Sequence, residues 1–149
     1  MRETGTINRD IDNLLSQLGH TDEIVVCDAG FAISSAVATV DISLAKNKPA
    51  VPEVLQELIR HFSVEKLVMA KETKAVSPTR FRAIVDLFDE GMPVETIPQT
   101  ESRQGARTVK GIIRTGDFTA YSNVLLISGA GDRWYVEQPG GKTTRTRKN

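Results

Sequence analysis

The sequence is poor in the residues from which disulfides and metal sites are built. Cys27 is the one cysteine among 149 residues, so the chain forms neither an internal disulfide nor a zinc cluster of cysteines. Two histidines and that cysteine are also a poor set of metal ligands. We therefore expect a protein with no disulfide and no metal.

Long apolar runs and an excess of either charge are absent too. No apolar run approaches the roughly 20 residues that span a bilayer, and the first ten residues lack the apolar core of a secretory signal. Nineteen Lys and Arg residues balance nineteen Asp and Glu residues, so the formal net charge is zero. Without a strong field of one sign, binding to nucleic acid or to an anionic membrane is not expected. The composition predicts a cytoplasmic globular protein with no nucleic-acid and no membrane partner.

Several motifs of cofactor and nucleophile chemistry are missing as well. The chain contains no Gly-x-Gly-x-x-Gly and no Gly-x-x-x-x-Gly-Lys-[Ser/Thr], so neither a dinucleotide site nor a P-loop is predicted. It contains no His-Glu-x-x-His and no Gly-x-Ser-x-Gly, which argues against a zinc-protease helix and a nucleophile elbow. No cofactor is expected.

Short apolar runs alternate with amphipathic segments along most of the chain. Apolar residues at helical spacing predict helices at 9–18, 51–62 and from 78 to a stop at Gly91, with a more polar helix at 101–109. Short β-branched runs predict strands at 24–27, 40–44, 66–70, 94–97, 112–113 and 124–127. This alternation indicates a single α/β domain of three layers, α/β/α, with a mainly parallel sheet covered by helices on both faces.

The end of the sequence differs in character from the rest. Residues 138–149 include no apolar side chain apart from proline, and four of them are basic. Such a segment cannot offset its ordering entropy by burial, so a flexible basic tail is predicted after a domain of residues 1–137. Contact of the tail with an acidic partner is the less favoured alternative.

His20 is the first candidate for chemistry. It follows the predicted helix stop at Gly19, and imidazole titrates near pH 6.5, so the side chain can give or take a proton under cellular conditions. The carbonyl end of the preceding helix would favour the charged ring and suit it to act as an acid. The alternative is a loop histidine that caps this helix end. His61 has the same structural alternative and no neighbour that favours a functional role.

Asp28 is the second candidate, at the carboxyl end of the first predicted strand. Open α/β sheets place their ligand sites at this end of the strands. The carboxylate could orient His20 or accept a hydrogen bond from a substrate hydroxyl, and the alternative is a turn residue in Asp-Ala-Gly. Cys27 precedes it inside an apolar run, which favours a buried structural thiol over a nucleophile.

A third cluster, Tyr121, Ser122 and Asn123, precedes the last predicted strand. Tyrosine offers an aromatic face and a hydroxyl, and asparagine offers both a donor and an acceptor. The set suits a neutral polyhydroxy ligand better than an anion, although ordinary loop chemistry explains it equally well.

Taken together, these motifs resemble those of the D-ribose pyranase family. The similarity runs from about Gly5 to Gly129, with the motifs in a specific order and spacing. They are Gly5-Thr-Ile-Asn8, Leu18-Gly-His-Thr-Asp22, Val25-Val-Cys-Asp-Ala-Gly30, Val40-Asp-Ile-Ser-Leu44, Ile112-Ile-Arg-Thr-Gly116 and Tyr121-Ser-Asn123. The related L-fucose mutarotases share the fold and the early histidine but usually have a different stretch where this chain has Asp28-Ala-Gly-Phe31.

The resemblance implies a cytoplasmic enzyme that interconverts the pyranose and furanose forms of a free monosaccharide such as D-ribose. It implies that His20 is the proton donor, that Asp28 binds substrate and that Tyr121 and Asn123 hold the far side of the sugar. It also implies that no metal or redox cofactor takes part. Related proteins assemble into rings, commonly decamers, in which a neighbouring chain completes each site.

Three differences from the family pattern concern the residues expected to contact the sugar. Gln99 stands where the family commonly has a histidine, and glutamine can hydrogen-bond a hydroxyl but cannot titrate. Arg103 replaces a lysine, which keeps the charge and changes its shape. Residues 31–36 lack the usual Pro-Ile-Pro. Substrate identity therefore stays open, and a fucose-type mutarotase and a non-catalytic sugar-binding protein are the alternatives.

Overall fold

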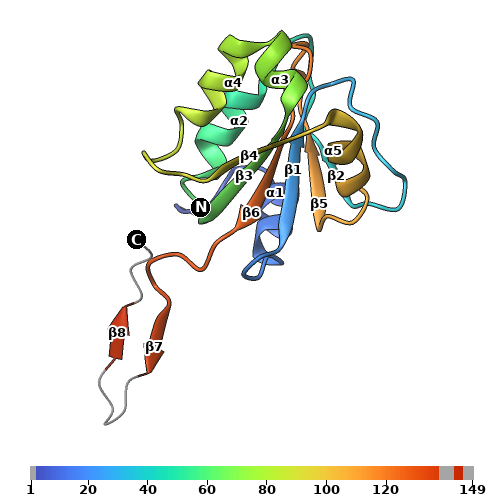
Figure 1. The fold of residues 1–149 in the computed structure, drawn as a ribbon. Coiled ribbons are helices and arrows are strands. Elements are labelled where there is room, and N and C mark those ends of the chain that lie inside the picture. The colour runs from blue at the N-terminus through green and yellow to red at the C-terminus, as the bar shows by residue number, and fades with distance from the viewer. Residues whose placement is uncertain (1–2, 138–142, 146–149) are drawn as a thin grey trace.

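The computed structural model describes residues 3–137 and 143–145, and its centre is a six-stranded sheet (Figure 1). The strand order is β2-β5-β1-β6-β3-β4. The strands are β1 (Glu23–Cys27), β2 (Thr39–Asp41), β3 (Val64–Ala70), β4 (Val94–Ile97), β5 (Gly111–Arg114) and β6 (Val124–Ser128). The helices are α1 (Arg9–Ser16), α2 (Val51–Leu58), α3 (Lys71–Val76), α4 (Pro78–Val85) and α5 (Gln99–Gly105). The predicted single α/β domain is confirmed.

The sheet is mixed, because β6 runs against both of its neighbours. The pairs β2–β5, β5–β1 and β3–β4 are parallel, whereas β1–β6 and β6–β3 are antiparallel. Only nine residues, 115–123, connect β5 to β6, and they form no helix. A return to the same direction needs a crossover of a dozen or more residues, so this short connection reverses the strand. The sequence predicted the strand but not its direction.

Helices cover both faces of the sheet, as predicted. On one face, α1, α2 and α4 pack on the inward side chains of the central strands. This core includes Ile11, Leu14, Ile24, Val26, Leu55, Leu67, Met69, Ile84, Ile113 and Leu126. On the other face a smaller core joins the end of α5 to the segment after β1, and it includes Val25, Cys27, Phe31, Val37, Ala106, Val109 and Ile112. Strand β1 therefore alternates between two cores and is buried on both faces.

Three helices end earlier than their apolar patterns predict. The helices predicted at 9–18 and 51–62 end at Ser16 and Leu58, and the third ends at Val85. The apolar residues beyond them lie in tight turns with i→i−3 bonds, such as Leu18 N–H to the Leu15 carbonyl at 3.2 Å and Phe88 N–H to the Val85 carbonyl at 3.1 Å. Such turns close helix ends and keep the side chains on the core face.

The structure also contains elements that the sequence did not predict. Helix α3 follows β3 directly and lacks an apolar stripe, since its one buried side chain is Thr73. Strands β7 (Tyr135–Glu137) and β8 (Thr143–Arg145) form a two-stranded ribbon apart from the main sheet (Figure 1). Three residues of the predicted tail thus lie in β8. The rest of that segment, 138–142 and 146–149, falls outside the described residues, so the flexible tail stays a prediction.

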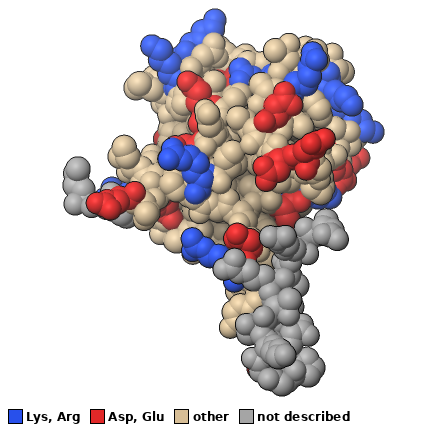
Figure 2. Space-filling model, turned by 90° about the vertical axis from the view of Figure 1, so that its left-hand side faces the viewer, with Lys and Arg blue, Asp and Glu red and all other residues tan. Residues whose placement is uncertain are grey.

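Charges of both signs are spread over the surface. Figure 2 shows acidic and basic side chains on the same face, in keeping with the zero net charge of the sequence. No helix in the described part of the chain is long and apolar enough to cross a bilayer. Within residues 3–137 and 143–145, no group of three His, Cys, Asp or Glu side chains is placed to hold a metal ion.

Candidate functional site

Polar residues at the ends of three strands converge on one edge of the sheet. Strands β1 and β5 are parallel, so Asp28 and Arg114 lie at the same edge, and antiparallel β6 begins there with Asn123 before it. A hollow of about 380 Å³ opens at this edge. It is lined by Asp28, Ala29, Gly30, Arg114, Asp117, Phe118, Thr119 and Ala120. This is where open α/β sheets place their ligands.

Asp28 and Asn123 are joined by two hydrogen bonds, although 95 residues separate them. The Asp28 backbone N–H donates to Asn123 Oδ1 at 2.8 Å, and Asn123 Nδ2 donates to Asp28 Oδ2 at 3.0 Å. Gly30 N–H donates to the other carboxylate oxygen at 3.0 Å. Burial raises the pKa of the Asp28 carboxyl, and the bonds from Asn123 and Gly30 oppose that shift. The carboxylate is thus held in one orientation and keeps lone pairs for a further hydroxyl donor.

Asp117 is the residue at this edge that sequence reasoning missed. It is fully buried, and its Oδ2 accepts hydrogen bonds from the Val51 backbone N–H at 2.8 Å and from Ser122 Oγ at 3.1 Å. Its Oδ1 accepts the Thr119 N–H at 2.8 Å, and its carbonyl accepts the Ala29 N–H at 2.9 Å. A buried carboxylate with this many donors fixes the loop that walls the hollow. Nothing in the sequence around Asp117 predicted this burial.

The Asp117 network also has a cationic member. Arg80 lies with one guanidinium nitrogen 3.5 Å from Asp117 Oδ2 and donates to Thr119 Oγ1 at 2.9 Å. Its side chain is 19% exposed, so the pair is largely sheltered from water. Ser122 therefore acts in this network, with its hydroxyl turned to Asp117 and 0% of the residue exposed. Its contact with a sugar stays a prediction.

Arg114 and Gly116 explain the Ile-Arg-Thr-Gly motif. The Arg114 guanidinium donates to the Ala29 carbonyl from two nitrogens, at 2.6 and 3.2 Å, and to Asp41 Oδ2 at 2.8 Å. It therefore holds the backbone directly after Asp28 to the end of β2. At Gly116 an added Cβ would lie 2.5 Å from the Lys48 carbonyl oxygen, so only glycine fits under that turn.

Tyr121, Gln99 and Arg103 lie around the same edge. Tyr121 has a φ of 59°, a left-handed conformation, and its carbonyl accepts a 2.8 Å bond from Thr73 Oγ1 in α3. Gln99 begins α5, and its N–H donates to Glu72 Oε2 at 2.9 Å. Arg103 lies further along α5 and lines a second hollow together with residues 32–35.

His20 lies at the opposite end of β1 from Asp28. It precedes the strand and Asp28 follows it, so five strand residues at about 3.3 Å each put about 16 Å between the two ends. The expectation that Asp28 orients His20 is therefore wrong for two residues of the same chain. The His20 neighbour is Glu65 at the start of β3, with Nε2 and Oε2 2.9 Å apart. Nothing in the local sequence pointed to this pair, which joins residues 45 apart.

The other two titratable candidates behave as structural groups. Cys27 is buried at the end of β1, and burial raises the pKa of its thiol to about 12. His61 pairs with Glu57 one helical turn before it, with Nε2 and Oε1 2.8 Å apart. It lies three residues beyond the end of α2 and lines neither hollow.

Comparison with known proteins decides the family. Residues 1–131 match the model of the RbsD / FucU transport protein family. The chain belongs to this family. D-ribose pyranases are similar along most of its length. The one from Halalkalibacterium halodurans is 39% identical and that from Pseudothermotoga lettingae 35%, each over 129 residues, covering 87% of this chain and 98% and 92% of the relatives.

Solved structures in the RbsD / FucU family have the same fold. Bacillus subtilis RbsD, solved in complex with D-ribose, superposes with a TM-score of 0.84 at 34% identity, covering 87% of this chain and 98% of that one. The fucose mutarotase of Streptococcus pneumoniae, in complex with L-fucose, gives a TM-score of 0.68 at 18% identity over 83% and 94% of the two chains. At that identity the likeness shows the fold alone. The resemblance read from the sequence motifs is confirmed.

Proposed function

We propose that this protein is a cytoplasmic sugar ring isomerase that interconverts the pyranose and furanose forms of a free monosaccharide, with D-ribose as the leading candidate. The observation that carries the proposal is the Asp28 carboxylate, which lines a hollow at the carboxyl edge of a sheet and is held by Asn123, in a chain 35–39% identical to D-ribose pyranases. A fucose-type mutarotase and a non-catalytic sugar-binding protein remain the alternatives.

The hollow suits a neutral, polyhydroxylated ligand. It offers the Asp28 carboxylate as an acceptor and the exposed Phe118 ring as an apolar surface. The basic residue in its lining, Arg114, already forms hydrogen bonds with Asp41 and with the Ala29 carbonyl, which leaves little uncompensated positive charge. A sugar that presents hydroxyls to the carboxylate and C–H groups to the ring matches this lining.

The reaction needs proton transfer and no change of oxidation state. Opening a cyclic hemiacetal requires a proton delivered to the ring oxygen and a proton removed from the anomeric hydroxyl, and reclosure on another hydroxyl changes the ring size. We assign delivery of the proton to His20. A positioned general acid raises the reaction rate by about 10²–10⁴-fold. Glu65 accepts the Nε2–H bond, so a ring that carries hydrogens on both nitrogens would deliver the one on Nδ1 to the sugar and keep the one on Nε2.

His20 reaches the sugar from a second copy of the chain in this proposal. The two ends of β1 place His20 and Asp28 too far apart to act on one sugar within a single chain. A ring of copies, as in the predicted decamer, brings the His20 end of one copy to the Asp28 hollow of its neighbour. Exposed apolar side chains, including Ile7, Leu44, Val76 and Phe118, supply surface for such an assembly to cover.

Exchange NMR on D-ribose at equilibrium tests the activity. We expect magnetisation transfer between pyranose and furanose signals with the wild-type chain and none above background with His20→Ala. His61→Ala is the matched control, because it removes the other histidine outside both hollows and should retain exchange. Sugar binding without exchange would favour the binding-protein alternative, and exchange confined to L-fucose would favour the mutarotase.

Mixing two inactive variants tests the shared site. His20→Ala keeps Asp28, and Asp28→Ala keeps His20. If each site takes one residue from each of two copies, unfolding and refolding the two variants together restores activity in about a quarter of the sites. If both residues act within one chain, the mixture stays inactive and the shared site is wrong.

A further inference from the structure

The loop that carries His20 is closed by a second carboxylate, that of Asp22. The Gly19 backbone N–H donates to Asp22 Oδ2 at 2.8 Å, and the Asp22 N–H donates to the Gly19 carbonyl at 3.3 Å. These two bonds enclose His20, so the backbone before the histidine is linked directly to the backbone after it. Asp22 is therefore placed to fix the main chain from which the His20 side chain projects.

Thr21, the residue between His20 and Asp22, has a strained backbone. Its φ is 69°, in the left-handed region that a β-branched residue rarely adopts. Such a conformation persists only where surrounding contacts hold it, and it is found most often at functional sites. Here the Thr21 N–H donates to the Ser128 carbonyl at 2.8 Å, and the Ser128 N–H donates to the Asp22 carbonyl at 2.8 Å. The end of β6 and the Asp22 carboxylate thus hold the loop together.

Lys110 is a second partner of the Asp22 carboxylate. Its Nζ lies 3.4 Å from Asp22 Oδ2, the same oxygen that accepts the Gly19 N–H. The Lys110 backbone N–H donates to the Glu23 carbonyl at 2.8 Å, which anchors the lysine beside the start of β1. The bond from Gly19 keeps the pKa of the Asp22 carboxyl below its ordinary value, burial opposes this shift and Lys110 adds to it. The carboxylate therefore stays a charged acceptor for both partners at neutral pH.

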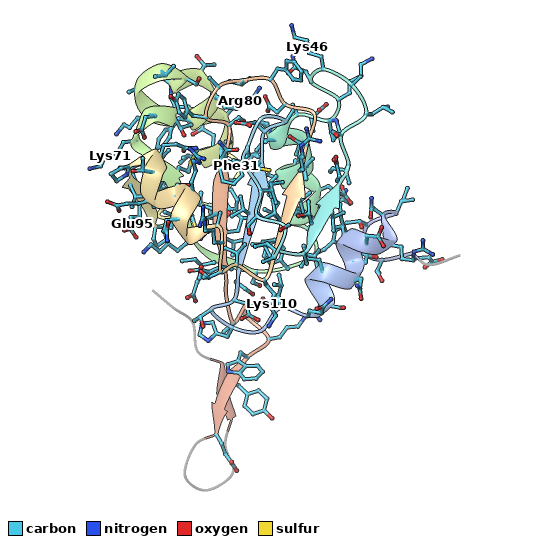
Figure 3. All side chains as sticks on the ribbon, turned by 90° about the vertical axis from the view of Figure 1, so that its right-hand side faces the viewer. Phe31, Lys46, Lys71, Arg80, Glu95 and Lys110 are labelled. Atoms are coloured by element: carbon cyan, nitrogen blue, oxygen red, sulfur yellow. The ribbon has the colours of Figure 1, made fainter. Side chains whose placement is uncertain are left out.

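The Asp22–Lys110 pair is far from the sugar hollow of its own copy. Neither residue lines either hollow. Figure 3 shows Lys110 at the opposite end of the sheet from Arg80, which contacts Asp117 in the wall of the sugar hollow. Any effect of the pair on the reaction therefore has to pass through His20.

A proton donor has to be held close to its productive position. The His20 side chain is 47% exposed, so packing does not fix it, and the bond to Glu65 orients the ring but not the backbone behind it. A displacement of about 1 Å can cost about 10²-fold in rate. We propose that Asp22 is a positioning residue for the sugar-ring reaction. With Lys110 it holds the left-handed backbone at Thr21 that directs His20 to the sugar. This inference rests on the proposed role of His20 as the proton donor.

Kinetics and sugar binding of full-chain variants test the proposal. In Asp22→Ala, kcat in the exchange NMR of D-ribose should fall at least about tenfold, because His20 is displaced. The calorimetric Kd for D-ribose should change by less than about twofold, because the hollow that binds the sugar is untouched. Asp22→Asn should retain more activity than Asp22→Ala, since its amide oxygen still accepts the Gly19 N–H. Lys110→Gln should lower kcat by a smaller factor than Asp22→Ala, since the Gly19 bond remains.

A matched control and a readout independent of turnover complete the test. Glu95 also pairs with a lysine, Lys66, and lies outside both hollows, so Glu95→Ala should exchange D-ribose like the wild type. Long-range ¹⁵N spectra at about pH 9, where the imidazole is neutral, show which ring nitrogen of His20 carries the hydrogen. The wild type should show it on Nε2, facing Glu65. In Asp22→Ala this preference should be lost, because the displaced ring no longer meets Glu65.

The outcomes separate this inference from the proposed function. An unchanged kcat or an unchanged His20 tautomer in Asp22→Ala overturns the positioning role, and so does an equal loss of kcat and of sugar affinity. If urea titration shows that Asp22→Ala does not fold, wild-type kcat in both Asp22→Asn and Lys110→Gln overturns it. A wild type that exchanges neither D-ribose nor L-fucose overturns the isomerase, while loss of the Nε2 tautomer in Asp22→Ala would still support the control of His20 by Asp22.

Discussion

Replacing Glu65 by Gln tests whether Glu65 determines which ring nitrogen of His20 carries the hydrogen. Glu65 Oε2 lies 2.9 Å from His20 Nε2, and a carboxylate can only accept, so it fixes the hydrogen on Nε2. An amide of the same size presents either a donor or an acceptor to that nitrogen. In Glu65→Gln the hydrogen of the neutral His20 ring is therefore no longer fixed on Nε2, while the packing stays almost unchanged.

The expected loss of activity follows from the exposure of the pair. The side chains are 47% and 23% exposed, so the pair contributes only about 0.2–1 kcal/mol to the free energy of unfolding. A hydrogen bond to a charged group contributes about 1.5–3 kcal/mol when it is sheltered from water. For a solvent-exposed hydrogen bond we take about 1 kcal/mol as the lower limit. At 1.4 kcal/mol per tenfold, kcat should fall between about fivefold and about a hundredfold in Glu65→Gln. The urea midpoint of unfolding should barely change.

The second histidine pair provides the control. Glu57 holds His61 Nε2 at 2.8 Å in a similar arrangement, so Glu57→Gln loosens a histidine that lies outside both hollows. Exchange NMR on D-ribose gives the rates, and long-range ¹⁵N spectra at about pH 9, above the ordinary imidazole pKa of about 6.5, report which ring nitrogen carries the hydrogen. The reasoning is refuted if Glu65→Gln and Glu57→Gln exchange sugar equally fast, or if the His20 tautomer is the same with and without Glu65.

Three further changes test the hollow. Asp117→Ala should lower the free energy of unfolding by about 3–5 kcal/mol in urea titration, because buried donors and Arg80 lose their acceptor; Asp89→Ala, on the surface, should change it by less than about 0.5 kcal/mol. Gly116→Ala should cost about 1–3 kcal/mol and abolish sugar binding, since the added Cβ forces the Lys48 turn outward; an unaltered melting temperature would contradict this. The pKa of Asp28 is raised in the folded chain, so the folded state holds the proton more tightly than the unfolded state. As pH rises from about 3.8, the wild type should lose stability relative to Asp28→Asn; a gain with rising pH would refute the assignment.

The sequence predicted those features of the fold that depend on neighbouring residues, such as where helices begin. The predicted starts of α1, α2 and α4, at Arg9, Val51 and Pro78, match the structure. Asn8 caps α1 by accepting the N–H groups of Asp10 and Ile11, as its residue type predicts. Asp28, which follows β1, also reaches the expected edge of the sheet, because parallel strands end together.

The tertiary structure decided which residues act as partners. Asp28 forms a hydrogen bond with Asn123, 95 residues away, and His20 pairs with Glu65, 45 residues away. In both pairs, the sequence around one residue does not predict its partner. The periodicity of a segment reports which side of it is apolar, but not which distant segment covers it. For the same reason the reversal of β6 and the burial of Asp117 followed from the short path of residues 115–123 over the end of the sheet. The separation of His20 from Asp28, in contrast, was already determined by the sequence. The two residues lie before and after β1, and an extended strand keeps its two ends apart.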